Sequence, residues 1–243
     1  MIDYHCHILP GLDDGSRDVA ESIEMATLLV DAGFSCVHCT PHCISNVYDI
    51  SVEQVRGAVT ELQHVLINAG IPLQLKPGME YYVDDQFFER LDNLQTLGDS
   101  NLLLFEISPT GNFNMLRRAV FQLRQRGLIP LLAHPERYPN LMSARRSVGF
   151  LRRFMQHKPQ IDSGYFGKFP SVVEEIISAG CFFQGNIGSF SGVYGQDVLC
   201  TAKTHRDQGH YQYFGSDGHR PGHLKRSLRG LELLHVGIDK VIT

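Results

Sequence analysis

Two histidines, His5 and His7, stand two residues apart after the short apolar segment Met1–Tyr4. On an extended chain, residues i and i+2 project to the same side, so both imidazoles can reach one point. Two acids, Asp13 and Asp14, follow in a glycine-flanked turn and would add oxygen ligands. This spacing predicts the beginning of a metal site, although a His-x-His pair alone is equally compatible with two hydrogen-bonded histidines.

The elements that must position these residues alternate between short apolar runs and longer segments of helical periodicity. Such alternation is typical of a parallel sheet with crossover helices. The predicted strands are 2–5, 35–40, 71–76, 101–107, 128–133, 181–185 and 211–215. The predicted helices are 18–32, 52–68, 85–94, 115–126, 141–157, 171–179, 198–208 and 224–235. Residues 159–170 fit neither pattern.

Further polar residues follow the ends of the predicted strands, and only the sixth strand supplies none. These residues are His42, Glu80, Glu106, His134, Asp217 and His219. In a closed or nearly closed parallel β/α barrel, the carboxyl ends of all strands meet at one face, where catalytic groups gather. The strands therefore predict a barrel of seven units. With His5, His7 and either Asp13 or Asp14, its pocket would hold nine nitrogen and oxygen donors. Since one ion cannot use nine donors, we expect two or three metal ions.

Each of these residues has an ordinary structural alternative when it is taken singly. His134 could cap a turn, Glu106 could pair with an arginine, and His42 could be a hydrogen-bonded core histidine. A carboxylate such as Glu106, inside the apolar run 102–107, would cost on the order of several kcal/mol if it were buried without a partner. Metal ions would neutralise the whole set, which favours the metal site. The other histidines are expected to be ordinary: His38, His64, His157, His205, His210, His223 and His235.

The composition restricts the function further. The 243 residues fit one α/β domain, and a formal net charge of −4 with scattered Lys and Arg gives no footprint for nucleic acid. We find no signal-peptide pattern and no apolar run of bilayer length, so we expect a cytoplasmic protein without membrane insertion. Cys36, Cys39 and Cys43 lack the fourth ligand of a zinc or iron–sulfur cluster and are expected to be reduced thiols.

Five segments resemble the motifs of the polymerase-and-histidinol-phosphatase (PHP) superfamily. They are 1–15, 40–42, 78–80, 133–138 and 216–219. Within this superfamily, the chain is most similar to the bacterial manganese-dependent tyrosine-protein phosphatases encoded with capsular and exopolysaccharide genes. The motifs occur in order over nearly the whole chain, and the long opening motif and the block at 133–138 make the resemblance specific.

This resemblance implies a distorted, TIM-like, seven-unit (β/α) barrel that fills residues 1–243 and carries three metal ions. It favours Mn²⁺, with Fe²⁺, Zn²⁺ and Co²⁺ as alternatives. By position, His5, His7, Glu80 and Asp217 would hold the first ion. Glu80, Glu106 and His134 would hold the second, and Asp14, His42 and His219 the third. Asp13 stays open as an alternative, because the choice of Asp14 rests on the resemblance alone.

The resemblance also implies catalytic roles for Arg137, Asp217 and His134. Arg137 matches a family arginine that contacts the substrate phosphate, and Arg220 is the nearest candidate for a second one. The implied partner is a phosphotyrosine protein, namely the tyrosine-rich C-terminal tail of a bacterial kinase that controls polysaccharide export.

The chemistry can also be argued without the family. A mixed carboxylate and imidazole site suits Mn²⁺, Fe²⁺ or Zn²⁺, and a metal-activated hydroxide would attack phosphorus in line while Arg137 holds the non-bridging oxygens. Histidinol phosphatase or another small-molecule phosphatase would share every ligand. Another metallohydrolase or a non-catalytic regulatory module are further alternatives, and self-association is left open.

Overall fold

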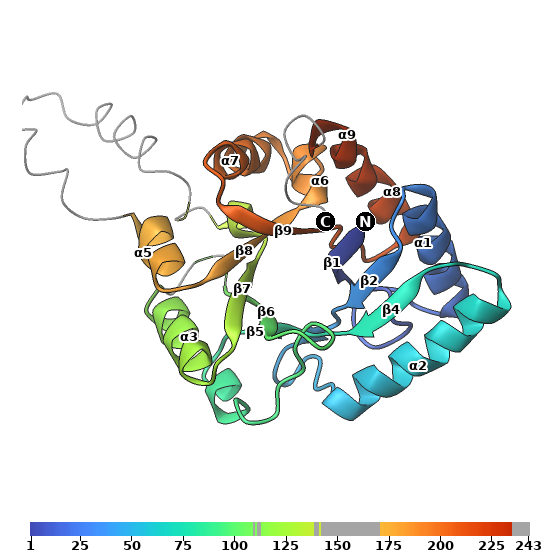
Figure 1. Cartoon of the computed structure of the whole chain (residues 1–243), viewed down its shortest axis with the longest axis horizontal. Coiled ribbons are helices and arrows are strands. Elements are labelled where there is room, and N and C mark those ends of the chain that lie inside the picture. Colours follow the sequence, from blue (N-terminus) through green and yellow to red (C-terminus); the bar gives the residue numbers. More distant parts are fainter. Residues whose placement is uncertain (109, 111–112, 139–140, 142–170, 235–243) are drawn as a thin grey trace, which may run out of the picture.

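Parallel strand pairing arranges the chain into two sheets (Figure 1). The computed structural model describes residues 1–108, 110, 113–138, 141 and 171–234. One sheet has the order β1 (Ile2–Cys6), β2 (Cys36–Cys39), β4 (Gln74–Pro77). The other has the order β3 (His42–Cys43), β5 (Glu80–Tyr82), β6 (Leu102–Glu106), β7 (Ile129–Ala133), β8 (Phe182–Asn186), β9 (Tyr211–Gly215). The predicted α/β class with parallel strands is therefore confirmed.

The described strands hydrogen-bond as two adjoining sheets, so they do not show the closed or nearly closed barrel of seven units that the sequence predicted. Pro41 separates β2 from β3, and Pro77 ends β4 shortly before β5. Proline has no backbone N–H to continue a strand ladder, so the pairing is interrupted at both places. At the other side, β1 adjoins the chain that follows β9, because the backbone N–H of Asp217 donates to the carbonyl of His5 at 2.7 Å.

Helices lie around the outside of the strands (Figure 1). The α-helices are α1 (Val19–Asp31), α2 (Val52–Asn68), α3 (Phe113–Gln125), α5 (Val172–Ser178), α6 (Ile187–Phe190), α7 (Gln196–Asp207), α8 (Pro221–Ser227) and α9 (Leu231–Leu234). Short 3-10 turns are η1 (Gln86–Glu89), η2 (Pro135–Arg137) and η4 (Leu228–Gly230). In α2, Val55, Val59 and Leu62 are buried at helical spacing, and Ser51 begins the helix by accepting a hydrogen bond from the N–H of Gln54.

Two predicted helices differ from the structure. The segment 85–94 forms only the turn η1, and the N–H of Gln95 donates to the hydroxyl of Tyr81 instead of to a helical carbonyl. The segment 224–235 is divided into α8, η4 and α9. The predicted helix at 141–157 and the segment 159–170 lie almost entirely outside the described residues. Among the helices that are described, none is both long and apolar enough to cross a bilayer.

Candidate metal centre

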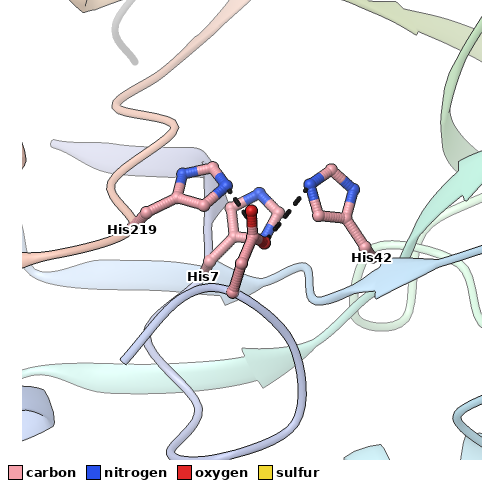
Figure 2. A group of neighbouring side chains, drawn as sticks. His7, His42 and His219 are labelled. Atoms are coloured by element: carbon pink, nitrogen blue, oxygen red, sulfur yellow. Dashed lines mark ion pairs between the residues drawn. The ribbon is translucent and has the colours of Figure 1, made fainter. Parts of the chain in front are cut away.

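The ends of the strands bring the predicted ligands to one place. His5 lies in β1, His42 begins β3, Glu80 begins β5, Glu106 ends β6, His134 follows β7, and Asp217 and His219 follow β9. Three groups have ligand atoms that all lie within 4.8 Å of one another. They are His5, His7 and Glu80; His42, Glu80 and Glu106; and His7, Asp14, His42 and His219. Figure 2 shows the rings of His7, His42 and His219 facing a common space.

Glu80 lies at the centre of this cluster and is fully buried. Its Oε2 atom is 3.1 Å from Nε2 of His5 and 3.1 Å from Nδ1 of His42, while Oε1 is 3.0 Å from Nε2 of His134. Burial alone would raise the pKa of this carboxyl, but the surrounding histidines, His5 first, outweigh burial and hold the pKa well below its usual range. An ionised carboxylate with two differently directed oxygens can bridge two cations.

The outer nitrogens of His5 and His7 are fixed by acceptors. Nδ1 of His7 lies 2.7 Å from a carboxylate oxygen of Asp13, and Nδ1 of His5 lies 2.9 Å from the amide oxygen of Gln184. These acceptors assign the protons to Nδ1 and leave the Nε2 lone pairs facing each other at 3.1 Å. Two such lone pairs repel unless a cation lies beside them, and carboxylate-held imidazoles of this kind are typical of metal ligands.

The carboxylates around His5 and His7 also favour positive charge on these two histidines. Burial opposes protonation of His7, yet Asp13 and the other carboxylates raise its pKa well above the usual value. Burial likewise opposes protonation of His5, and Glu80 and Asp217 outweigh it to raise the pKa. The pocket therefore stabilises a cation at Nε2 of both histidines, as a metal site must.

Asp13 and Asp14 have different environments. The side chain of Asp13 is buried, and its Oδ2 accepts from Nδ1 of His7 and from the backbone N–H of His42 at 2.8 Å. The Asp14 side chain is 53% exposed, and its Oδ1 lies 3.7 Å from Nε2 of His42 and 3.6 Å from Nε2 of His219. Asp13 thus orients His7 through its Nδ1 atom, whereas Asp14 faces the Nε2 atoms of His42 and His219.

The two oxygens of Asp217 have different partners. Oδ1 lies 3.5 Å from Nε2 of His5 and 3.4 Å from Nε2 of His7. Oδ2 accepts hydrogen bonds from Nη2 of Arg137 at 2.6 Å and from Nδ2 of Asn186 at 2.8 Å. Burial would raise the pKa of this carboxyl, but Arg137 and His5 hold it well below its usual range. Asp217 therefore connects the cluster of ligands to the candidate phosphate-binding arginine.

Some buried nitrogens at this cluster lack hydrogen-bond partners. Within the part of the chain that the structure describes, Nδ1 of His134 and Nε of Arg137 make no hydrogen bond. His134 and Asp217 also have positive φ angles, 34° and 50°, which non-glycine residues rarely adopt. Unpaired donors and acceptors and strained backbone concentrate at functional sites, so these residues fit a site that binds metal and an anion.

Arg220, the second candidate for phosphate binding, is paired with a carboxylate in the structure. Its Nη1 lies 3.4 Å from a carboxylate oxygen of Glu21, on α1. A substrate contact by Arg220 would therefore require the side chain to leave Glu21.

Sequence reasoning missed the contribution of the sixth predicted strand. In β8, Gln184 accepts from His5 and Asn186 donates to Asp217. The signal was present, because both amides stand within or directly after a run of buried residues where an apolar side chain would be expected. His223 was predicted to be ordinary, but its Nε2 lies 3.0 Å from the hydroxyl of Tyr194, a residue next to the site that the sequence did not single out.

Parallel strands and the loops beside them bring buried carboxylates and imidazoles together, an arrangement typical of α/β metalloenzymes. Residues 1–162 match the family described as "Capsular polysaccharide synthesis, CpsB/CapC". This match covers more than half of the chain, and the chain belongs to that family.

Relatives of known name agree with this family. The chain is 29% identical over 238 residues to the tyrosine-protein phosphatase YwqE of Bacillus subtilis (strain 168), covering 96% of this chain and 84% of that protein. It is 25% identical over 150 residues to the tyrosine-protein phosphatase CpsB of Streptococcus pneumoniae, covering 61% and 62%. The predicted resemblance to capsular tyrosine-protein phosphatases is confirmed.

The fold is similar to a solved structure of the same group. That structure comes from work on YwqE of Bacillus subtilis and CpsB of Streptococcus pneumoniae, described there as unique metal-dependent tyrosine phosphatases. The TM-score is 0.78 at 28% sequence identity, and the match covers 98% of this chain and 89% of the other.

Proposed function

We propose that this chain is a metal-dependent protein-tyrosine phosphatase that regulates capsule or exopolysaccharide synthesis. The observation that carries the proposal is the convergence of imidazole and carboxylate donors around the buried Glu80, with Arg137 beside them. Its relatives are named tyrosine-protein phosphatases. The proposed substrate is a phosphotyrosine protein in the cytoplasm, namely the tyrosine-rich tail of a bacterial kinase.

The proposed metal ligands are the nine residues that the strand ends bring together. His5, His7, Glu80 and Asp217 would hold one ion, Glu80, Glu106 and His134 a second, and Asp14, His42 and His219 a third. Divalent cations bound there would supply Lewis-acid activation of water and neutralise the phosphoryl oxygens. A mixed set of nitrogen and oxygen donors suits Mn²⁺, which we propose, or Fe²⁺, Zn²⁺ or Co²⁺, better than Mg²⁺.

Arg137 is the proposed phosphate-binding residue. Its guanidinium is held at one edge by Asp217, while the buried Nε has no partner among the described residues. A non-bridging phosphate oxygen would accept a charge-assisted hydrogen bond from this guanidinium, whose side chain is 25% exposed. Because Asp217 also faces His5 and His7, the phosphate would lie next to the proposed cations.

We also propose that the two sheets are parts of one distorted seven-unit barrel, and that residues 1–243 form one domain. The support is the contact between β1 and β9. The isolated parallel bridge between Cys6 and Gly218 lies at the same junction.

The proposal is tested by measuring phosphate release from a phosphotyrosine peptide and from histidinol phosphate in Mn²⁺, with and without a chelator. Chelator-sensitive turnover of the peptide in preference to the metabolite is expected. A preference for histidinol phosphate would assign the chain to small-molecule phosphatases, and no turnover of either would contradict phosphatase activity. His134→Ala should abolish turnover, whereas His64→Ala, on an exposed face of α2, is the matched control and should not.

A further inference from the structure

The aromatic ring of Tyr194 lies against the face of the Arg137 guanidinium. Cζ of Arg137 is 3.7 Å from the ring centroid. Tyr194 belongs to the turn 191–194 between α6 and α7, far from η2 in the sequence. Stacking on an aromatic face stabilises a planar cation and restricts its rotation out of the stacked plane.

Tyr194 is itself held in place from several sides. Its hydroxyl lies 3.0 Å from Nε2 of His223, on α8, and accepts from Nδ2 of Asn186 at 3.4 Å. The same hydroxyl lies 3.5 Å from Oδ2 of Asp217, to which it can donate. Gly188 packs close to the edge of the ring, because a Cβ at this position would come within 3.1 Å of Cε2 of Tyr194. The ring is thus a fixed surface and not a freely rotating side chain.

The orientation of Arg137 depends on the ring of Tyr194, because its other contact, with Asp217, holds the guanidinium at one edge only. Nη2 is bound to Asp217, but the side chain is 25% exposed and Nε has no partner in the described ranges. A guanidinium held at one edge can still rotate about that contact. The face of Tyr194 removes this rotation and fixes the direction in which the free N–H points.

We infer that Tyr194 is a positioning residue, which holds Arg137 in the orientation that binds the substrate phosphate. The inference rests on the proposed phosphatase function and names a residue that acts through Arg137 without itself contacting the phosphate. The aromatic ring carries this role, and the contacts of the hydroxyl with His223, Asn186 and Asp217 fix the ring.

The test compares Tyr194→Leu, which removes the aromatic face, with Tyr194→Phe, which keeps it. Tyr213→Leu is the matched control, because Tyr213 is also a partly buried tyrosine but packs on Tyr4 and Phe182. For each protein, kcat and KM for a phosphotyrosine peptide, the Ki of inorganic phosphate and the metal content are measured. We expect Tyr194→Leu to raise KM and Ki about tenfold with metal content unchanged, and Tyr194→Phe to raise them about threefold or less.

A double-mutant cycle separates positioning from general packing. If Tyr194 acts through Arg137, Tyr194→Leu should add less than about a twofold further loss in the Arg137→Ala protein. Equal losses in both backgrounds would overturn the inference. So would KM and Ki values for Tyr194→Leu that match those of Tyr213→Leu.

An NMR measurement distinguishes failure of this inference from failure of the proposed function. The Nε–H resonance of Arg137, identified by its loss in Arg137→Lys, should be shifted by the ring in the wild type and in Tyr194→Phe but not in Tyr194→Leu. An unshifted resonance in the wild type would overturn the stacking whatever the enzyme does. A shifted resonance in a protein that neither hydrolyses phosphotyrosine nor binds phosphate would contradict the proposed function alone.

Discussion

Asp13 and Asp14 are chemically identical neighbours that the turn after β1 directs to different partners. The side chain of Asp13 is buried against His7, and that of Asp14 faces His42 and His219. Their spacing from His5 and His7 predicted oxygen ligands near the histidines, but it did not decide between them. Which side chain enters the site depends on backbone angles within a glycine-flanked turn, which residue spacing does not specify.

We predict that Asp13→Ala and Asp14→Ala have different effects on metal binding. Asp14→Ala removes a donor from the exposed group and should lower the bound metal by about one equivalent. Asp13→Ala removes the acceptor that orients His7 and should leave the stoichiometry unchanged while weakening affinity about 10- to 100-fold. Calorimetric titration with Mn²⁺ measures both quantities. The reverse pattern would show that Asp13 is the direct ligand.

At the scale of elements, the helices and longer strands were predictable because their signals are local. Val52–Asn68 combines a capping serine with an apolar stripe, and Tyr211–Gly215 is a short run between turn residues. The strands β3 and β5 were not predicted, since two or three residues carry no periodicity and exist only through pairing with distant partners. The amides of Gln184 and Asn186 in β8 were overlooked for a related reason, because their hydrogen-bond partners lie in β1 and in the loop after β9.

The junction of β9 with β1 gives a second prediction. A Cβ on Gly215 would lie 2.5 Å from Cβ of His5 and 2.7 Å from its backbone nitrogen, closer than atoms can approach. Gly215→Ala should therefore separate the two strands, lower the free energy of unfolding by about 1–3 kcal/mol and weaken metal binding at His5. Urea denaturation and metal analysis test this.

Gly222→Ala is the matched control, because a Cβ there meets nothing within 4 Å. This helical glycine in α8 should tolerate alanine or gain about 0.5–1 kcal/mol in stability. A Gly215→Ala protein as stable as the wild type would contradict the described contact between β9 and β1.

For the molecule as a whole, stability should decrease in mild acid through His205. This side chain is 3% exposed, and burial together with the nearby His210 lowers its pKa from 6.5 to about 4. Between these values the unfolded state binds the proton more readily than the folded state. The contribution of His205 to stability is therefore fully present above pH 6.5 and is lost as the pH falls toward 4, by about 2 kcal/mol between pH 7 and pH 5.

Chemical denaturation at pH 7 and pH 5, in a chelator, measures this loss. His205→Phe should fit next to Phe183 and Tyr211 and should lose about 2 kcal/mol less than the wild type over this interval. His64→Phe, on the exposed face of α2, should behave as the wild type does. Equal acid losses in all three proteins would exclude His205 as the cause.

The whole arrangement was predictable only in part. The order of strands and helices, and the expectation that polar residues at strand ends would meet, followed from the rule for parallel sheets. The interruption of the ring at Pro41 and Pro77 did not follow, because it depends on which hydrogen bonds each strand makes across the sheet. The pairing of Arg220 with Glu21 is equally a matter of long-range geometry.

We propose that the clustered donors hold the cations that make this chain a phosphotyrosine phosphatase. To test this, the protein is stripped of metal, the loss is verified by metal analysis, and phosphate release from a phosphotyrosine peptide is measured as Mn²⁺ is returned. We expect no turnover in the stripped protein and recovery that reaches a plateau at two to three equivalents of Mn²⁺ per chain. Full turnover in the stripped protein, or none after reloading, would contradict this role of the donors.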